Sequence, residues 1–277
     1  MRRADAFLGV AVGALAMFVG SKIAGRRPSA ATTIARVQQS DARSSADSAQ
    51  SPPEGVVATR SSDRRPVFEH RDVTVIQRGE IAPVANPDQV RAQIAAATGG
   101  YMADMLAADS GLLVRWPDDR QEKGLRIWVQ SASTVRDWNA RYAQMARDAF
   151  ADWSGSGLPA RLDFVLDSAS SDIQVVWVDR FPPELGREAG NTTRASDRHG
   201  WLVAAVVTVA IHDSVGDAIE PAELAGVVRH EAGHALGLGH SADSTTKMFP
   251  IEMVNDITLA DRATLRLLYR LPPGSVR

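Results

Sequence analysis

The sequence predicts an α+β fold for residues 112–277, a sheet covered by helices, and two kinds of pattern support it. Apolar and polar residues alternate at 125–130 and 161–166, as on half-buried strands, while the runs 173–178 and 201–211 are almost wholly apolar. Helical spacing of apolar residues appears between these strands, at 138–153, and a proline at position 221 suits the first turn of another helix. Strand and helix patterns that are mixed in this way indicate one packed domain.

Each of these elements has an expected buried face. The strand at 125–129 should bury its odd-numbered residues, and the next strand should bury Leu162, Phe164 and Leu166. Thr134 and Asp137 resemble a capping box, which predicts that the next helix begins there. The apolar face of that helix comprises Trp138, Tyr142, Met145, Ala149 and Trp153. We expect these side chains to lie in the core.

The first part of the chain, residues 1–25, reads as a targeting segment. An uncharged run from Ala6 to Ser21 follows Arg2 and Arg3 and precedes Lys22. This pattern fits a retained N-terminal membrane anchor or a signal peptide that is removed. We expect the anchored form, with the catalytic domain outside the cytoplasm, and secretion after cleavage is the alternative.

Two further segments precede the domain. Residues 26–66 are rich in Ser, Ala, Arg and Pro and have no apolar period, which predicts a disordered linker. Residues 67–111 are either a lead-in or a pro-segment. Within them, Val73, Val75 and Ile81 indicate a short extended segment. A helix should follow from Pro87 to about residue 108, with a break at residues 99–100, which are both glycine.

Composition excludes several classes of function. The net charge is −2, whereas a nucleic-acid-binding chain carries a basic excess. The chain contains no cysteine, which excludes disulfides, thiolate metal sites and a cysteine nucleophile. Any metal ion must therefore be held by His, Asp or Glu side chains.

Three of the six histidines fall in the pattern H-E-x-x-H-x-x-G-x-x-H. His230 and His234 are four positions apart, so on a helix they share one face and can bind one metal ion. Glu231 lies beside them and can reach a metal-bound water, which makes it a candidate general base. Gly237 can end the helix in a left-handed conformation and return the chain, so that His240 supplies a third ligand. Three protein ligands with an open position are typical of a catalytic zinc ion.

These residues resemble those of the metzincin metallopeptidases, and within them the matrixins. The similarity extends to Ser241, to Met248–Pro250 at the spacing of the matrixin Met-turn, and to a final helix that opens at Thr258–Asp261. The resemblance implies a twisted, mostly parallel sheet with an antiparallel edge strand, an active-site helix and a C-terminal helix. It also implies that Met248 forms an apolar floor beneath the zinc ion.

The resemblance assigns further roles. It implies a substrate-binding edge strand at Gly190–Arg194. It implies a buried Asp261 that bonds the Met-turn backbone, whereas the residues alone also allow a simple first-turn acid. It places four residues around the pocket for the side chain that follows the scissile bond, namely Gly226, Pro250, Ile251 and Met253.

The chain also departs from the family. Matrixins often hold their latent state with a cysteine, so any latency here has another basis. His70, His199 and His212 lack the spacing of the second, structural zinc site, and we expect no such site. His199 and His212 read as solvated turn residues. Three acids could bind calcium or could be plain loop and helix-start acids, namely Asp213, Asp217 and Glu220.

The sequence therefore predicts a monomeric zinc endopeptidase with one catalytic zinc ion and a polypeptide substrate. Glu231 would act as general base toward a zinc-activated water. Two alternatives stay open: a maturation protease or exopeptidase with a single dedicated substrate, and a non-catalytic zinc-binding interaction domain. No nucleic-acid partner is expected, and contact with a membrane would be made by the N-terminal helix.

Overall fold

A six-stranded sheet forms the centre of the protein in the computed structural model, which describes residue 68, residues 74–77 and residues 80–277 except 252. The strand order is β1-β6-β7-β5-β3-β4. Neighbouring strands pair in parallel, except that β6 is antiparallel to β7. The strands are β1 (Thr74–Gln77), β3 (Leu125–Val129), β4 (Leu162–Val165), β5 (Ile173–Val178), β6 (Gly190–Ser196) and β7 (Leu202–Ala210).

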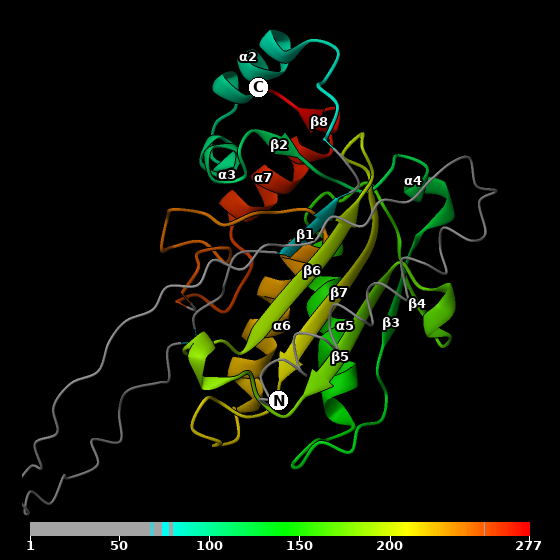
Figure 1. Cartoon of the computed structure of the whole chain (residues 1–277), viewed down its shortest axis with the longest axis vertical. Coiled ribbons are helices and arrows are strands. Elements are labelled where there is room, and N and C mark those ends of the chain that lie inside the picture. The colour runs from blue at the N-terminus through cyan, green and yellow to red at the C-terminus, as the bar shows by residue number, and fades with distance from the viewer. Residues whose placement is uncertain (1–67, 69–73, 78–79, 252) are drawn as a thin grey trace, which may run out of the picture.

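Two long helices, α5 (Arg141–Ser154) and α6 (Pro221–Ala235), pack against one face of the sheet (Figure 1). Helix α6 begins at the predicted proline and lies between α5 and strands β6 and β7. It is therefore buried along most of its length and forms the centre of the core. Helix α5 faces it with Ala143, Ala146, Ala149, Phe150 and Trp153.

The remaining larger elements gather at one end of the sheet (Figure 1). They are α2 (Pro87–Ala96), α3 (Met102–Ala108), α7 (Leu259–Leu268) and a two-stranded antiparallel sheet of β2 (Leu112–Leu113) and β8 (Gly274–Ser275). The short helices α4 (Arg120–Lys123), η1 (Ser168–Ser170) and η2 (Pro183–Leu185) lie in the connections. Helices α2 and α3 contribute to the same core cluster as α5 and α6, through Val90, Ile94, Met102, Met105 and Leu106.

The predicted fold class is confirmed, and two local predictions are wrong. Helix α5 begins at Arg141 and not near Thr134, because Asp137 adopts a left-handed backbone with φ 60°, which interrupts any helix there. Of the three residues expected to be buried there, Leu162 is partly buried against the core, whereas Phe164 is 39% exposed and Leu166, just after β4, is 96% exposed. Strand β4 is the last strand of the sheet and has a neighbouring strand, β3, on one side only.

The expectation of a free edge at Gly190–Arg194 is also corrected. Strand β6 pairs with β7 on one side and with β1 on the other, where Thr74 lies opposite Thr193 and Gln77 opposite Ser196. An unpaired strand edge exposes a row of N–H and C=O groups that recruits an extended segment. The segment Thr74–Gln77 fills this role, so Thr193 and Arg194 lie inside the sheet.

The predicted membrane-anchored localisation is corrected as well. No helix within the described part of the chain combines the length and the apolar character that a membrane span requires. The apolar run Ala6–Ser21 and the linker 26–66 lie outside the described residues.

Candidate metal centre

The structure brings the three motif histidines together. The Nε2 atom of His230 lies 2.9 Å from that of His234 and 3.3 Å from that of His240, and the last two are 3.1 Å apart. Ligands 2.0–2.1 Å from a tetrahedral ion would be about 3.3 Å apart, so the spacing is close to that of a tetrahedral site. Within the described residues, this is the one group of three His, Asp or Glu side chains that could hold a metal ion.

Backbone carbonyls orient two of the rings. The Nδ1 atom of His230 lies 2.8 Å from the carbonyl oxygen of Lys247, and Nδ1 of His234 lies 2.9 Å from that of Leu238. A carbonyl can only accept, so each Nδ1 carries a hydrogen, and a ring that binds a metal ion is neutral. The lone pair is then on Nε2, the atom that faces the centre of the cluster, and this donor set fits a metal cation.

Glu231 is buried beside the histidines and is held by strand β6. The hydroxyl of Thr192 donates to Glu231 Oε2 at 2.7 Å. Gly190, two residues earlier on the same face of β6, gives the carboxylate its room, because a Cβ there would lie 2.8 Å from Glu231 Oε1. The glycine and the threonine of β6 therefore fix where this carboxylate points.

The helix and the segment after it are shaped by two close approaches. Met248 is fully buried, and a Cβ added to Gly233 would lie 2.5 Å from its sulfur, so the methionine packs against α6 between His230 and His234. Gly237 has φ 110°, and a Cβ there would lie 2.7 Å from the carbonyl oxygen of Val114. Only glycine fits this turn, which directs the chain back toward His240.

Asp261 lies beneath this segment and is fully buried. Its carboxylate accepts hydrogen bonds from the backbone N–H groups of Lys247 and Met248, at 2.9 and 3.3 Å, and caps its own helix through Thr258. The hydroxyl of Tyr101 donates to it at 3.0 Å. Burial, and then the charge and hydrogen bond of Asp261, raise the pKa of Tyr101 well above its usual value, so this hydroxyl keeps its proton.

The remaining sequence-predicted residues have mixed environments. Gly226 is buried within α6, Pro250 and Ile251 are half-buried, and Met253 is exposed. Lys247 is buried and its Nζ donates to the carbonyl oxygen of Val254. Because its own carbonyl bonds His230, Lys247 links the segment after Met248 to the three histidines.

The predicted calcium acids do not form a common site. Asp213 Oδ1 accepts the backbone N–H groups of Val215, Gly216 and Asp217, as in a tight polar turn. No group that includes these acids gathers three possible ligand atoms in the described residues. Calcium therefore has no support in the structure.

His199 is exposed at a turn, as predicted, but His212 is not a solvated residue. Its side chain is fully buried between two carboxylates. Its Nε2 lies 2.9 Å from Asp137 Oδ2, and its Nδ1 lies 2.9 Å from Asp179 Oδ1. His212 therefore joins the ends of β5 and β7 to the segment before α5.

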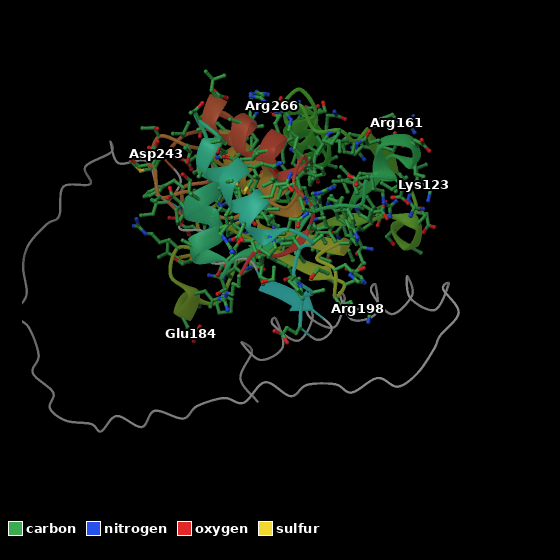
Figure 2. All side chains as sticks on the ribbon, turned by 90° about the horizontal axis from the view of Figure 1, so that it is seen from above. Lys123, Arg161, Glu184, Arg198, Asp243 and Arg266 are labelled. Carbon is green, nitrogen blue, oxygen red and sulfur yellow. The ribbon has the colours of Figure 1, made fainter. Side chains whose placement is uncertain are left out.

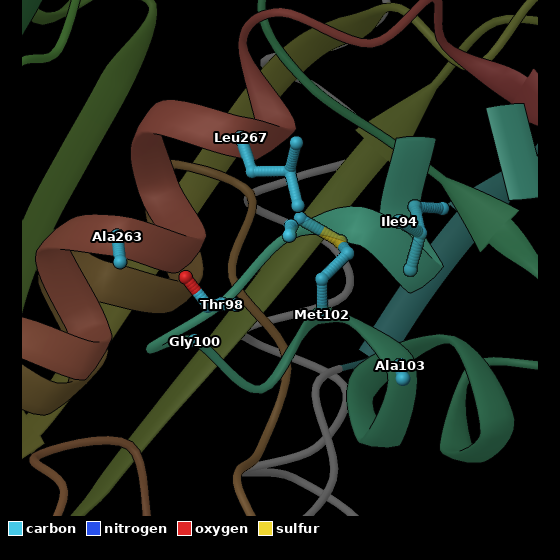
Figure 3. Close-up of a pocket in the computed structure, with 8 residues that line it drawn as sticks. Ile94, Thr98, Gly100, Met102, Ala103, Ala263 and Leu267 are labelled. Atoms are coloured by element: carbon cyan, nitrogen blue, oxygen red, sulfur yellow. The ribbon is translucent and has the colours of Figure 1, made fainter. Parts of the chain in front are cut away.

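A small pocket of about 60 Å³ lies elsewhere, between α7 and the connection from α2 to α3 (Figure 3). Ile94, Met102 and Leu267 line it, and none of the motif histidines does. It reflects the packing of the lead-in helices on α7 and has no part in the metal centre.

The sequence pattern did not single out Thr192, Tyr101 or Arg194. Each reaches the site from a distant part of the chain, and a threonine, a tyrosine and an arginine outside any motif give no signal of that contact. Only the position of β6 beside α6 could have suggested Thr192 and Arg194.

Comparison with known proteins agrees with this geometry. Residues 128–270 match the family model of the peptidase M10 group, described as matrixin. No relative was found among curated proteins. The match begins at the end of β3 and covers strands β4 to β7, both long helices, the three histidines and α7.

Proposed function

Since this chain belongs to the matrixin family, which is zinc-dependent, we propose that it is an endopeptidase that binds one zinc ion through His230, His234 and His240. The observation that carries the proposal is the convergence of three Nε2 atoms within 2.9–3.3 Å of one another, directly beside a buried glutamate. A bound zinc ion supplies Lewis-acid chemistry, because it acidifies water and polarises a peptide carbonyl.

Glu231 performs the proton transfers in this proposal. Its carboxylate accepts a proton from the attacking water while the water oxygen bonds to the peptide carbon. The same carboxylate then returns the proton to the nitrogen of the departing amine as the C–N bond breaks. The hydroxyl of Thr192 holds the carboxylate in one orientation through both steps.

The substrate is a polypeptide that lies between β6 and the segment after Met248. Four residues would line the pocket for the side chain after the scissile bond, namely Gly226, Pro250, Ile251 and Met253. Lys247 supports that pocket because its ammonium group holds the carbonyl of Val254.

Replacement of the general base tests the proposal. Glu231→Gln should keep the fold and the zinc ion but lower kcat by about 100- to 10,000-fold, because the amide cannot accept the proton. Glu220→Gln is the matched control, since it removes an exposed carboxylate at the start of the same helix. Zinc content by metal analysis and peptide cleavage are measured for both variants. Glu231→Gln activity near that of the wild type would refute the mechanism.

The alternatives give different results in the same assays. A non-catalytic zinc-binding domain would bind zinc and cleave nothing. A protease with one dedicated substrate would leave unrelated unfolded proteins intact, whereas the proposed endopeptidase cleaves them at internal bonds.

A further inference from the structure

Arg194 is a buried cation next to the metal cluster, although it belongs to no motif. The chain's other arginines include Arg161, Arg198 and Arg266, which lie at the periphery in Figure 2. Arg194, by contrast, is 1% exposed. A guanidinium stays protonated in proteins, so Arg194 carries its charge beside the three histidines. Burial of an arginine is costly unless its charge and N–H groups have partners, and in Arg194 the group Nη1 has them, whereas Nε makes no hydrogen bond.

The partners of Arg194 are two carbonyls at the carboxyl end of α6. Its Nη1 donates to the carbonyl oxygen of His234 at 3.1 Å and to that of Leu238 at 3.2 Å. A cation is favoured at this end of a helix, where the last carbonyls lack helical partners. The two carbonyls lie on either side of the turn at Gly237, so one nitrogen spans the turn between His234 and His240.

The carbonyl of Leu238 also orients a proposed zinc ligand. It accepts the Nδ1 hydrogen of His234 at 2.9 Å, so Arg194 and the imidazole share one acceptor. Groups that fix the outer nitrogen of a metal-bound histidine control the direction in which its inner nitrogen points. Arg194 therefore acts on His234 through Leu238.

Strand β6 provides the register for this contact. Thr192 and Arg194 are two residues apart, about 6.6 Å along a strand, and they face the same side. Glu231 and His234, which they contact, are nearly one turn apart, about 5 Å along a helix. Strand β6 therefore positions two parts of the site. Thr192 orients the proposed general base, and Arg194 holds the end of the helix that carries the ligands.

We propose that Arg194 is a positioning residue of the metal centre, which sets the orientation of His234 and the path of the turn to His240. This inference rests on the proposed zinc site. In this proposal, the charge of Arg194 orients the ligands and does not contact the substrate.

Zinc affinity measured apart from activity tests the inference. Arg194→Met keeps an unbranched stem but removes both hydrogen bonds, and its zinc Kd should rise at least about tenfold, the usual effect of removing such support. Arg194→Lys keeps the charge and should recover part of the loss. The zinc Kd is measured by chelator competition, and the d–d spectrum of the cobalt-substituted protein reports ligand geometry. The melting temperature of the metal-free form is recorded alongside.

Arg120→Met is the matched control. Arg120 donates to buried Asp172 near β3 and forms ion pairs with Asp172 and Asp119, so its loss should lower the melting temperature but leave zinc Kd and the cobalt spectrum unchanged. A zinc Kd of Arg194→Met within twofold of the wild type would overturn the inference, and so would an equal rise in Arg120→Met. If Arg194→Met does not fold, Arg194→Gln is measured instead, and a zinc Kd within twofold of the wild type would again overturn the inference. A wild-type chain that binds no zinc would instead overturn the proposed site itself.

Discussion

Asp261 connects parts of the chain that are distant in sequence. It receives the backbone N–H groups of the segment under the histidines, caps α7 and accepts the hydroxyl of Tyr101 from the start of α3. Such a buried carboxylate is stable only while its donors are in place, and the donors are likewise stable only while the carboxylate is present. The support of Met248 therefore depends on one side chain that does not itself touch the metal cluster.

Removal of that carboxylate should destabilise the protein and loosen the metal site. Asp261→Ala leaves the N–H groups of Lys247 and Met248 buried without an acceptor, so the free energy of unfolding should fall by more than about 2 kcal/mol. Zinc affinity should fall with it. Asp243→Ala is the control, because Asp243 is exposed and its carboxylate accepts hydrogen bonds from the nearby Thr245. Thermal melts and zinc titration are measured for both variants. A melting temperature of Asp261→Ala equal to that of the wild type would show that Asp261 is only a simple helix-start acid.

The elements at the other end of the sheet are joined by a buried histidine. His212 lies between Asp137, ahead of α5, and Asp179, after β5. The hydrogen bond from His212, with a smaller contribution from the charge of Arg136, lowers the pKa of Asp137. A carboxyl whose pKa is lower in the folded state stabilises the fold above its unfolded pKa, about 3.9, and this contribution is lost as pH falls through the folded value.

The sign of this linkage gives a pH-dependent prediction. Asp137→Asn should melt at a lower temperature than the wild type at pH 7, and the difference should shrink as pH falls below about 4. Asparagine tolerates the left-handed backbone at this position, so the variant isolates the charge. Both proteins are measured with a chelator present, which removes the effect of metal loss. A difference that stays constant from pH 7 to pH 3 would contradict the linkage, and Asp148→Asn on the exposed face of α5 is the control.

For the whole molecule, the sequence placed the start of the catalytic domain at residue 112, but part of the lead-in segment before it packs into the same core. Ile81, Val84 and the apolar residues of α2 and α3 are buried in the core cluster of the catalytic region. Ala82 and Val84 also exchange backbone hydrogen bonds with Ser275 of β8. We infer that residues 80–111 belong to the folded unit, together with β1 before them, and that this segment is not a removable pro-segment.

Two truncated chains test the extent of the folded unit. A chain that starts at residue 112 should fail to fold or should expose apolar surface, because it loses these buried side chains and the Tyr101 bond to Asp261. A chain that starts at residue 80 should melt cooperatively. Equal melting temperatures for the two chains would show that residues 80–111 are dispensable.

The sequence predicted local periodicity and metal spacing well, and it failed where the outcome depends on tertiary neighbours. The helix at Pro221 and the three histidines follow from spacing on one element, which short-range geometry determines. The exposure of Leu166 depends on β4 being outermost, and the burial of His212 depends on two acids that lie more than 30 residues away. Nothing in the neighbouring residues of either one carries that information.

Strand β1 has a consequence for the choice of substrate. Only residues 78–80 separate it from buried Ile81, and the N–H of Ala82 is bonded to Arg198 just beyond β6. A segment tethered so closely has an effective concentration in the range of about millimolar or above. A peptide that extends along Thr193–Ser196 must outcompete this internal strand for the same backbone groups, whereas a peptide that ends at Thr192 does not. For the proposed endopeptidase, β1 would therefore limit how far a bound peptide extends along β6 in that direction.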